Sequence, residues 1–181
     1  FDGRTVSGHR AWNLGVPLPE GTHTLPEALS KRGYRTGAVG KVHLTPQVAG
    51  CPEFPENEDF WNREPEPDWR GPYFGFGWVD LFVGHTKLIG HYGQYIKRGF
   101  PELVRRYDRK YAIDIPTGAP NSWKCGFPLA QHSCTWICER TLAFLKQQDE
   151  RPFFLQCSFP FPHFPFAPPL PYCDQYDPDV M

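Results

Sequence analysis

A lysine and two histidines follow the two segments of the chain that are most typical of buried strands. Lys41 and His43 come directly after residues 34–39, and His163 lies five residues past the apolar run 153–158. The spacing of Lys41 and His43 points both side chains the same way if the extended conformation continues. Because parallel strands of an open α/β sheet bring their carboxyl ends to one edge, we expect the three side chains to meet there. A lysine charge and proton-transferring imidazoles would suit an anionic substrate, although a lone histidine in a loop is more often a surface or structural residue.

The strand before Lys41 is preceded by a helix signature over residues 22–33. Thr24 as the N-cap and Glu27 three residues later form a capping box, and Gly33 is typical of the residue that ends a helix. A helix followed by a buried strand is half of the repeating unit of an α/β sheet.

A second helix–strand unit is predicted near the end of the chain. Ser133 is expected to cap a helix that runs to about residue 148. The apolar residues on one face of this helix are Ile137, Phe144 and Leu145. The following run 153–158 does not alternate with polar residues, which predicts a strand covered on both faces.

Between these units, residues 45–130 show little periodicity and are rich in proline, glycine and aromatic residues. A loop region of this size is typical of an active-site cover or an insertion, within which one short polar helix is expected over 103–111. The predicted fold class is therefore α/β, part of a large mixed sheet flanked by helices, with a long loop-rich middle.

Charge and hydropathy exclude two classes of protein. The 181 residues carry 19 Lys and Arg against 20 Asp and Glu, a net charge of −1, so the chain lacks the basic excess of a nucleic-acid binder. No stretch approaches the roughly 18 consecutive apolar residues that a membrane span needs.

The chain begins with Phe1 and its single methionine is Met181, so we expect an internal segment whose cellular compartment the sequence leaves unknown.

The six cysteines leave the redox compartment open as well. Cys134 and Cys138 lie one helical turn apart and could share a metal or a disulfide, but a zinc site needs two further ligands at matching spacing. We interpret the two as small residues packed on a helix face.

Three segments, in order along the chain, carry a resemblance to the sulfatase family. Residues 33–44, GYRTGAVGKVHL, resemble the second sulfatase signature G-Y-x-T-x-x-x-G-K-W-H-L-G, with Val42 in place of Trp and Thr45 in place of Gly. Residues 82–92 are similar to a G-H…G-H-Y pattern of a bacterial subgroup. Residues 158–166, SFPFPHFPF, resemble the S-F-P-D-P-H-H-P-F of that subgroup.

The resemblance implies a fold of the alkaline phosphatase superfamily and hydrolysis of sulfate monoesters. In the family a formylglycine hydrate is the nucleophile and a divalent cation, usually calcium, helps to hold the sulfate oxygens. Carried over by motif, Lys41 would contact the sulfate and the nucleophile, and His43 would support the nucleophile. His163 would contact the sulfate and act as a candidate acid at the leaving-group oxygen.

The chain departs from the family pattern at several points. No cysteine or serine begins the C/S-x-P/A-x-R run that yields formylglycine, and Phe161 and Phe164 replace a family Asp and His. Because Phe1 to Arg4 resembles the L-T-G-R that follows that run, the formylglycine is expected upstream of Phe1. We therefore expect residues 1–181 to be a partial catalytic domain that holds no metal ligands itself, with calcium bound elsewhere in the complete protein.

Other interpretations stay open. The chain could belong to a catalytically inactive sulfatase-like binding or structural domain, or to a related hydrolase of phosphate or phosphonate esters. The expected partner is a sulfated small molecule or a sulfated sugar, which the sequence does not distinguish. We also predict that His85 and His91 are structural or substrate-loop residues rather than metal ligands, because the family's cation prefers oxygen.

Overall fold

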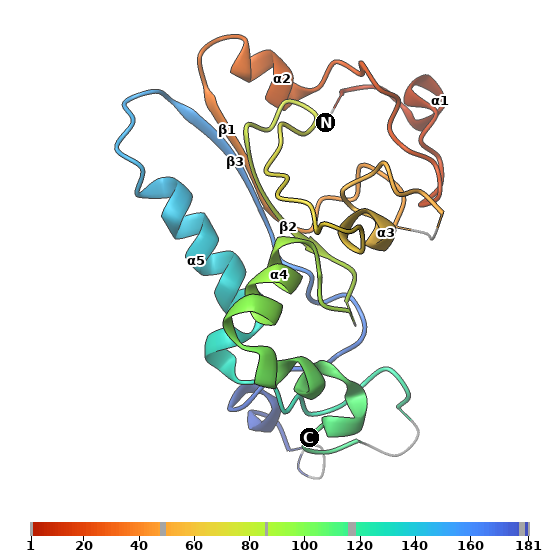
Figure 1. Ribbon diagram of the computed structural model, residues 1–181, viewed down its shortest axis with the longest axis vertical. Coiled ribbons are helices and arrows are strands. Elements are labelled where there is room, and N and C mark those ends of the chain that lie inside the picture. Colours follow the sequence, from red (N-terminus) through yellow and green to blue (C-terminus); the bar gives the residue numbers. More distant parts are fainter. Residues whose placement is uncertain (1, 48–49, 86, 116–118, 178–179, 181) are drawn as a thin grey trace.

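The computed structural model describes residues 2–47, 50–85, 87–115, 119–177 and 180, and within them one parallel sheet (Figure 1). Its strands are β1 (Arg35–Gly40), β2 (Trp78–Val83) and β3 (Phe153–Ser158), in the order β2–β1–β3. The α-helices are α1 (Val6–His9), α2 (Leu25–Ser30), α3 (Glu58–Trp61), α4 (Gly90–Gly99) and α5 (Ser133–Leu145). The predicted α/β class is confirmed. All three strands run parallel, so their carboxyl ends lie at one edge of the sheet.

The sheet separates two hydrophobic cores. On one face Ala38 and Leu81 pack with Phe60 and Trp61 of α3. The core on the other face consists of Val39, Phe82, Leu88, Tyr92, Ile96, Leu103, Phe127, Trp136 and Ile137. Because successive side chains of a strand point to opposite faces, the central strand β1 is buried throughout.

The unit formed by α2 and β1 follows the sequence signals. The Thr24 hydroxyl accepts a hydrogen bond from the Glu27 N–H at 3.2 Å, as expected for an N-cap, and Gly33 has φ +85°. Such a backbone angle favours glycine and ends the helix. The helix is shorter than predicted, but the strand lies where it was expected.

The unit formed by α5 and β3 differs in detail from the prediction. The N-cap of α5 is His132, whose Nδ1 accepts from the Cys134 N–H at 3.3 Å, so Ser133 is the first helical residue and not the cap. Ile137 and Phe144 are buried as expected, whereas Leu145 is 42% exposed.

The prediction that β3 is covered on both faces is wrong for the part of the chain that the structure describes. Phe153 is 50% exposed and Cys157 is exposed as well. The physical reason is thinner cover: Phe154 and Leu155, one on each face, pack against the two cores but stay partly buried, whereas β2, the other outer strand, is largely buried. All six cysteines carry free thiols.

The predicted loop-rich middle contains three elements that the sequence analysis missed, α3, β2 and α4. The helix expected over 103–111 is two 3-10 turns, Pro101–Tyr107 and Arg109–Tyr111. Asp108 separates them because its backbone is extended and its carboxylate accepts from the Lys110 N–H at 3.0 Å, which starts the second turn.

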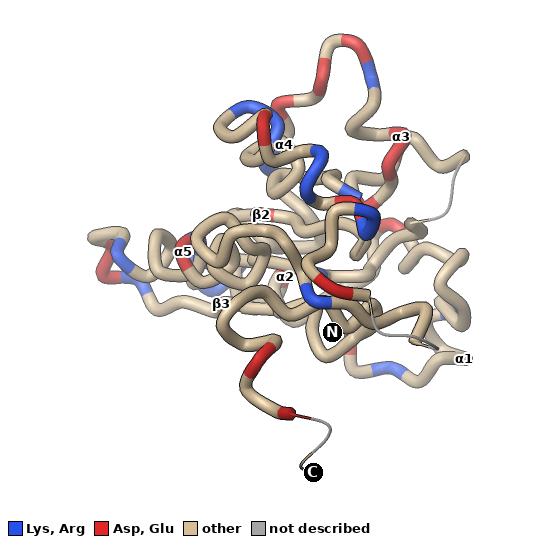
Figure 2. Tube along the Cα trace, turned by 90° about the horizontal axis from the view of Figure 1, so that it is seen from below, with Lys and Arg blue, Asp and Glu red and all other residues tan. Residues whose placement is uncertain are grey.

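The distribution of charge follows the composition. Figure 2 shows Lys and Arg close to Asp and Glu in several loops and helices, in keeping with the net charge of −1. None of the described helices is long and apolar enough to cross a membrane.

Candidate active site

The chain turns sharply at the carboxyl end of β1, immediately before Lys41. Gly40 has φ +99°, and a Cβ atom there would lie 1.9 Å from the carbonyl oxygen of Ser158 at the end of β3. The Lys41 N–H donates to that same carbonyl at 3.1 Å. Only glycine allows this approach, which holds the ends of β1 and β3 together.

Side chains from three strand ends meet beyond this turn. Lys41 Nζ contacts Nε2 of His85, which follows β2, and the imidazole rings of His85 and His163 stack with centroids 4.1 Å apart at 10°. His43 lies near enough to Lys41 and His163 for their charges to act on its titration. The structure thus brings Lys41, His43 and His163 to one edge, as expected, and adds His85. Their catalytic roles stay predictions.

The contact between Lys41 and His85 defines the protonation state of the imidazole. A lysine ammonium only donates, so Nε2 of His85 accepts and the ring is neutral. Burial, reinforced by the charges of Lys41, His163 and His43, lowers the pKa of His85 to about 4. Burial also lowers the pKa of Lys41, although the Glu56 carboxylate opposes this shift.

A buried carboxylate, Glu56, fixes the backbone that carries His43. Glu56 is 1% exposed and accepts hydrogen bonds from the N–H groups of His43, Leu44 (2.6 Å) and Thr45 (3.0 Å). His43 has φ +72°, a conformation that costs a non-glycine residue of order 1–3 kcal/mol. The three bonds to a charged acceptor compensate for this strain and set the direction of the His43 side chain.

Tyr73 completes the surroundings of Glu56. Its hydroxyl donates to Glu56 Oε1 at 2.7 Å and lies 2.8 Å from the hydroxyl of Thr45. Burial and the neighbouring carboxylate raise the pKa of Tyr73, so the phenol keeps its proton and donates it. Burial, followed by the charge of Lys41, lowers the pKa of His43, so a neutral imidazole is favoured there.

The sequence analysis missed Glu56 and the place of His85. A signal for His85 existed, because Gly84–His85 repeats the arrangement of Gly40–Lys41: both glycines have positive φ and end a strand. Glu56 lies in a proline-rich stretch 11 to 17 residues from its partners, and no local motif marks it.

His91 has a structural role, as predicted. Its ring is 3% exposed, Nδ1 accepts from the Leu81 N–H at 2.8 Å, and Nε2 donates to the Trp69 carbonyl at 2.7 Å. Burial lowers the pKa of His91 to about 4, because a second ring proton would face the Leu81 N–H.

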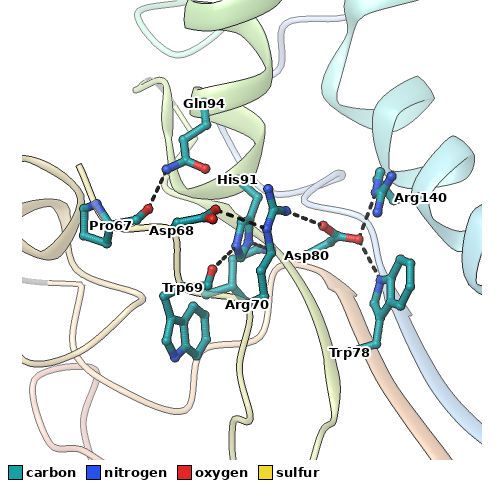
Figure 3. Close-up of polar contacts among 10 residues, drawn as sticks. Pro67, Asp68, Trp69, Arg70, Trp78, Asp80, His91, Gln94 and Arg140 are labelled. Carbon is teal, nitrogen blue, oxygen red and sulfur yellow. Dashed lines mark hydrogen bonds and ion pairs between the residues drawn. The ribbon is translucent and has the colours of Figure 1, made fainter. Parts of the chain in front are cut away.

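A second group of charged residues surrounds Asp80 on the face of β2 that carries α4 and α5 (Figure 3). Asp80 is 2% exposed and accepts from Arg140 Nε at 2.9 Å, Trp78 Nε1 at 2.7 Å and Arg70 at 3.5 Å. A cavity of about 790 Å³ opens beside it, lined by these residues. Because the buried carboxylate is paired with two guanidinium groups whose side chains are 35% (Arg140) and 57% (Arg70) exposed, we assign this group to stability and not to chemistry.

The donor atoms at the candidate site do not suit a calcium ion. Calcium takes six to eight oxygen ligands, whereas Lys41, His43, His85 and His163 offer nitrogen, and the Glu56 carboxylate is occupied by backbone N–H groups and a phenol. Among the residues that the structure describes, no three His, Cys, Asp or Glu side chains are placed to share a metal ion. The calcium implied by the resemblance therefore has no site in this part of the chain.

The three-stranded parallel sheet with a basic cluster at its carboxyl edge has a counterpart among solved structures. A solved structure with this fold is the phosphonate monoester hydrolase of Agrobacterium radiobacter, with a TM-score of 0.63 and 24% identity; the match covers 99% of this chain and 33% of that one. The sulfatase family model matches residues 2–180, and the chain belongs to the sulfatase family.

Curated relatives point the same way. The chain is 27% identical to the multifunctional alkaline phosphatase superfamily protein PehA of Trinickia caryophylli, over 99% of this chain and 33% of that protein. It is also 27% identical to an arylsulfatase of Clostridium perfringens, over 85% of this chain and 30% of that protein. An N-acetylgalactosamine-6-sulfatase of the dog is 27% identical to the chain, over 86% of this chain and 25% of that protein. The chain therefore spans a quarter to a third of the length of these relatives.

Proposed function

We propose that the protein to which this chain belongs hydrolyses sulfate monoesters, with Lys41, His43, His85 and His163 at the reacting group. The observation that supports this most is the convergence of one ammonium and three imidazoles from the ends of three adjacent strands. Such a cluster suits a tetrahedral oxyanion, which the lysine ammonium can bind and at which imidazoles can transfer protons.

Each residue has a distinct proposed role. Lys41 binds a sulfate oxygen with its ammonium group, and His85 holds that group in place through Nε2. His163 donates Nδ1–H to the Phe164 carbonyl at 2.5 Å, so Nε2 carries a proton only in the imidazolium form, and that form gives the Nε2 proton to the leaving oxygen as its bond to sulfur breaks. His43, neutral because its pKa is lowered, accepts a proton from the attacking group. Formylglycine and calcium, which the resemblance implies, would come from residues other than these.

Hydrolysis of phosphonate or phosphate monoesters is the second candidate. The same cluster of nitrogen donors suits any tetrahedral oxyanion, and one relative, PehA, is described as multifunctional. A third candidate, a sulfatase-like binding domain without activity, would keep the anion contacts and lack turnover.

Paired substrates separate these candidates. The longest natural protein that contains this chain is assayed with 4-nitrophenyl sulfate and with a 4-nitrophenyl phosphonate monoester, alongside Lys41→Gln. Since one lost donor to a developing oxyanion typically costs about 10²- to 10³-fold, we expect kcat/KM for the sulfate to fall by that factor. Lys87→Gln, which removes an exposed lysine paired with Glu58, is the matched control and should leave the rate unchanged. A preference for the phosphonate would favour the second candidate, and binding without turnover the third.

A further inference from the structure

Two segments that are distant in sequence pair with each other beyond the candidate active site. Residues 166–169 run parallel to residues 121–125. The Trp123 N–H donates to the Phe166 carbonyl at 3.1 Å, and the Phe166 N–H donates to the carbonyl of residue 121 at 2.8 Å. Because His163 lies three residues before Phe166, this pairing attaches the segment that carries His163 to the rest of the fold.

The pairing brings two cysteines to the same residue, Pro169. Cys125 forms a β-bridge with Pro169, and the Cys173 N–H donates to the Pro169 carbonyl at 3.2 Å. Lys124 and Asp174, the sequence neighbours of the two cysteines, form an ion pair at 2.6 Å. A disulfide needs two cysteines on backbones that lie close together, and these contacts supply that arrangement.

The two thiols are partly exposed and influence each other. Burial raises the pKa of Cys125, and the charge of Cys173 raises it as well, so the two groups lie within electrostatic reach. Burial also raises the pKa of Cys173, which the Lys124 ammonium opposes. Because the thiolate is the reacting form, the pair should react faster as the pH rises above neutral.

We propose that Cys125 and Cys173 are a site of reversible oxidation, at which a disulfide fixes the segment that carries His163. The oxidant is a small disulfide, for which oxidised glutathione is the probe. The thiolate of one cysteine attacks this disulfide, forms a mixed disulfide and releases one reduced glutathione. The other cysteine loses its proton, attacks the mixed disulfide and releases a second reduced glutathione. The protein gives up two electrons and two protons, which the glutathione disulfide takes up, and no step depends on the proposed function.

Peptide mapping tests the pairing in the longest natural protein that contains the chain. The reduced protein is incubated with oxidised glutathione at about pH 8, and the remaining thiols are alkylated. Chymotrypsin, which cleaves after aromatic residues and leucine, leaves Cys125 on peptide 124–129 and Cys173 on peptide 173–176, apart from the other four cysteines. We expect these two peptides to be joined, with a mass two hydrogens below the sum of their thiol forms.

Two variants check the assignment. Cys173→Ser should abolish the joined peptide, whereas Cys138→Ser, which removes an exposed thiol of α5, should leave its yield within about twofold. Alkylated or glutathione-bound peptides that stay separate in the wild type, or Cys125 joined to Cys134 instead, would overturn the proposal.

Amide hydrogen exchange tests whether the disulfide fixes the segment. Since the bond links the two paired segments at one end, their separation is restricted, and protection of the Trp123 and Phe166 amides should rise at least about tenfold on oxidation. The amides of β1 serve as the internal reference and should not change. Equal protection of Trp123 and Phe166 in the reduced and oxidised protein would refute the fixing role.

Discussion

The carboxylate of Glu56 is expected to control the order of the loop that carries His43, and Glu56→Gln tests this directly. The substitution keeps Oε1, which accepts from Leu44, Thr45 and Tyr73, and turns the oxygen that faces the His43 N–H into a second donor. One hydrogen bond to a charged group, worth about 1.5–3 kcal/mol, is lost, and the others lose their charge assistance. A total of about 3 kcal/mol shifts the equilibrium between ordered and open loop about 150-fold toward the open form.

Amide hydrogen exchange measures that equilibrium. Protection of the amides of residues 43–45 should fall about 100-fold in Glu56→Gln, because exchange follows local opening of the loop. Glu53→Gln changes an exposed carboxylate in the same segment and should leave the protection unchanged. Unaltered exchange at residues 43–45 in Glu56→Gln would show that other contacts hold His43 in its left-handed conformation, and the positioning role would be refuted.

Three further predictions concern His85, His91 and Asp80. His85→Gln keeps an acceptor for Lys41 and should retain kcat/KM within about threefold, whereas His85→Ala should lose about tenfold or more in a steady-state assay. Folding lowers the pKa of His91 from 6.5 to about 4, so between these pH values the unfolded state binds more protons than the folded state. Urea titrations should therefore show that the free energy of unfolding falls by up to about 3 kcal/mol as the pH is lowered from 6.5 to 4. An equally large fall in His91→Asn would contradict this. Asp80→Asn should cost about 1.5–3 kcal/mol of unfolding free energy because the acceptor of three hydrogen bonds loses its charge, while Glu58→Gln, in a partly exposed ion pair with Lys87, should change it little.

The parts of the fold that could be predicted are those whose signals are local in sequence. Thr24 caps α2 through a residue three positions away, and Gly33 and Gly40 end a helix and a strand by their own backbone angles. Lys41 and His43 follow such a strand, so their place at the sheet edge could be inferred from order along the chain. The same reasoning placed His163, because β3 pairs with β1 in parallel.

The missed elements depend on contacts that are distant in sequence. In β2 the buried polar residue Asp80 breaks the apolar pattern, and its partner Arg140 lies 60 residues away. In α4, Gly93 faces the backbone of Leu88, where a Cβ atom would lie 2.4 Å from the carbonyl oxygen, so the buried side of the helix carries a glycine instead of an apolar side chain. Neither feature has a period that a window of sequence could reveal.

The two glycines that precede Lys41 and His85 explain how one edge of the sheet acquires so many ionisable groups. A glycine with positive φ at the end of a strand turns the following residue away from the direction of the strand. At Gly40 the missing Cβ also lets the backbones of β1 and β3 come within hydrogen-bonding distance of each other at Ser158. The ammonium and the imidazoles are therefore close because backbone packing permits it, before any charge interaction is counted. Their mutual repulsion is reduced by burial, which favours neutral imidazoles at His43 and His85, and by the carboxylate of Glu56 behind the loop, so that the lysine charge is directed at an incoming anion.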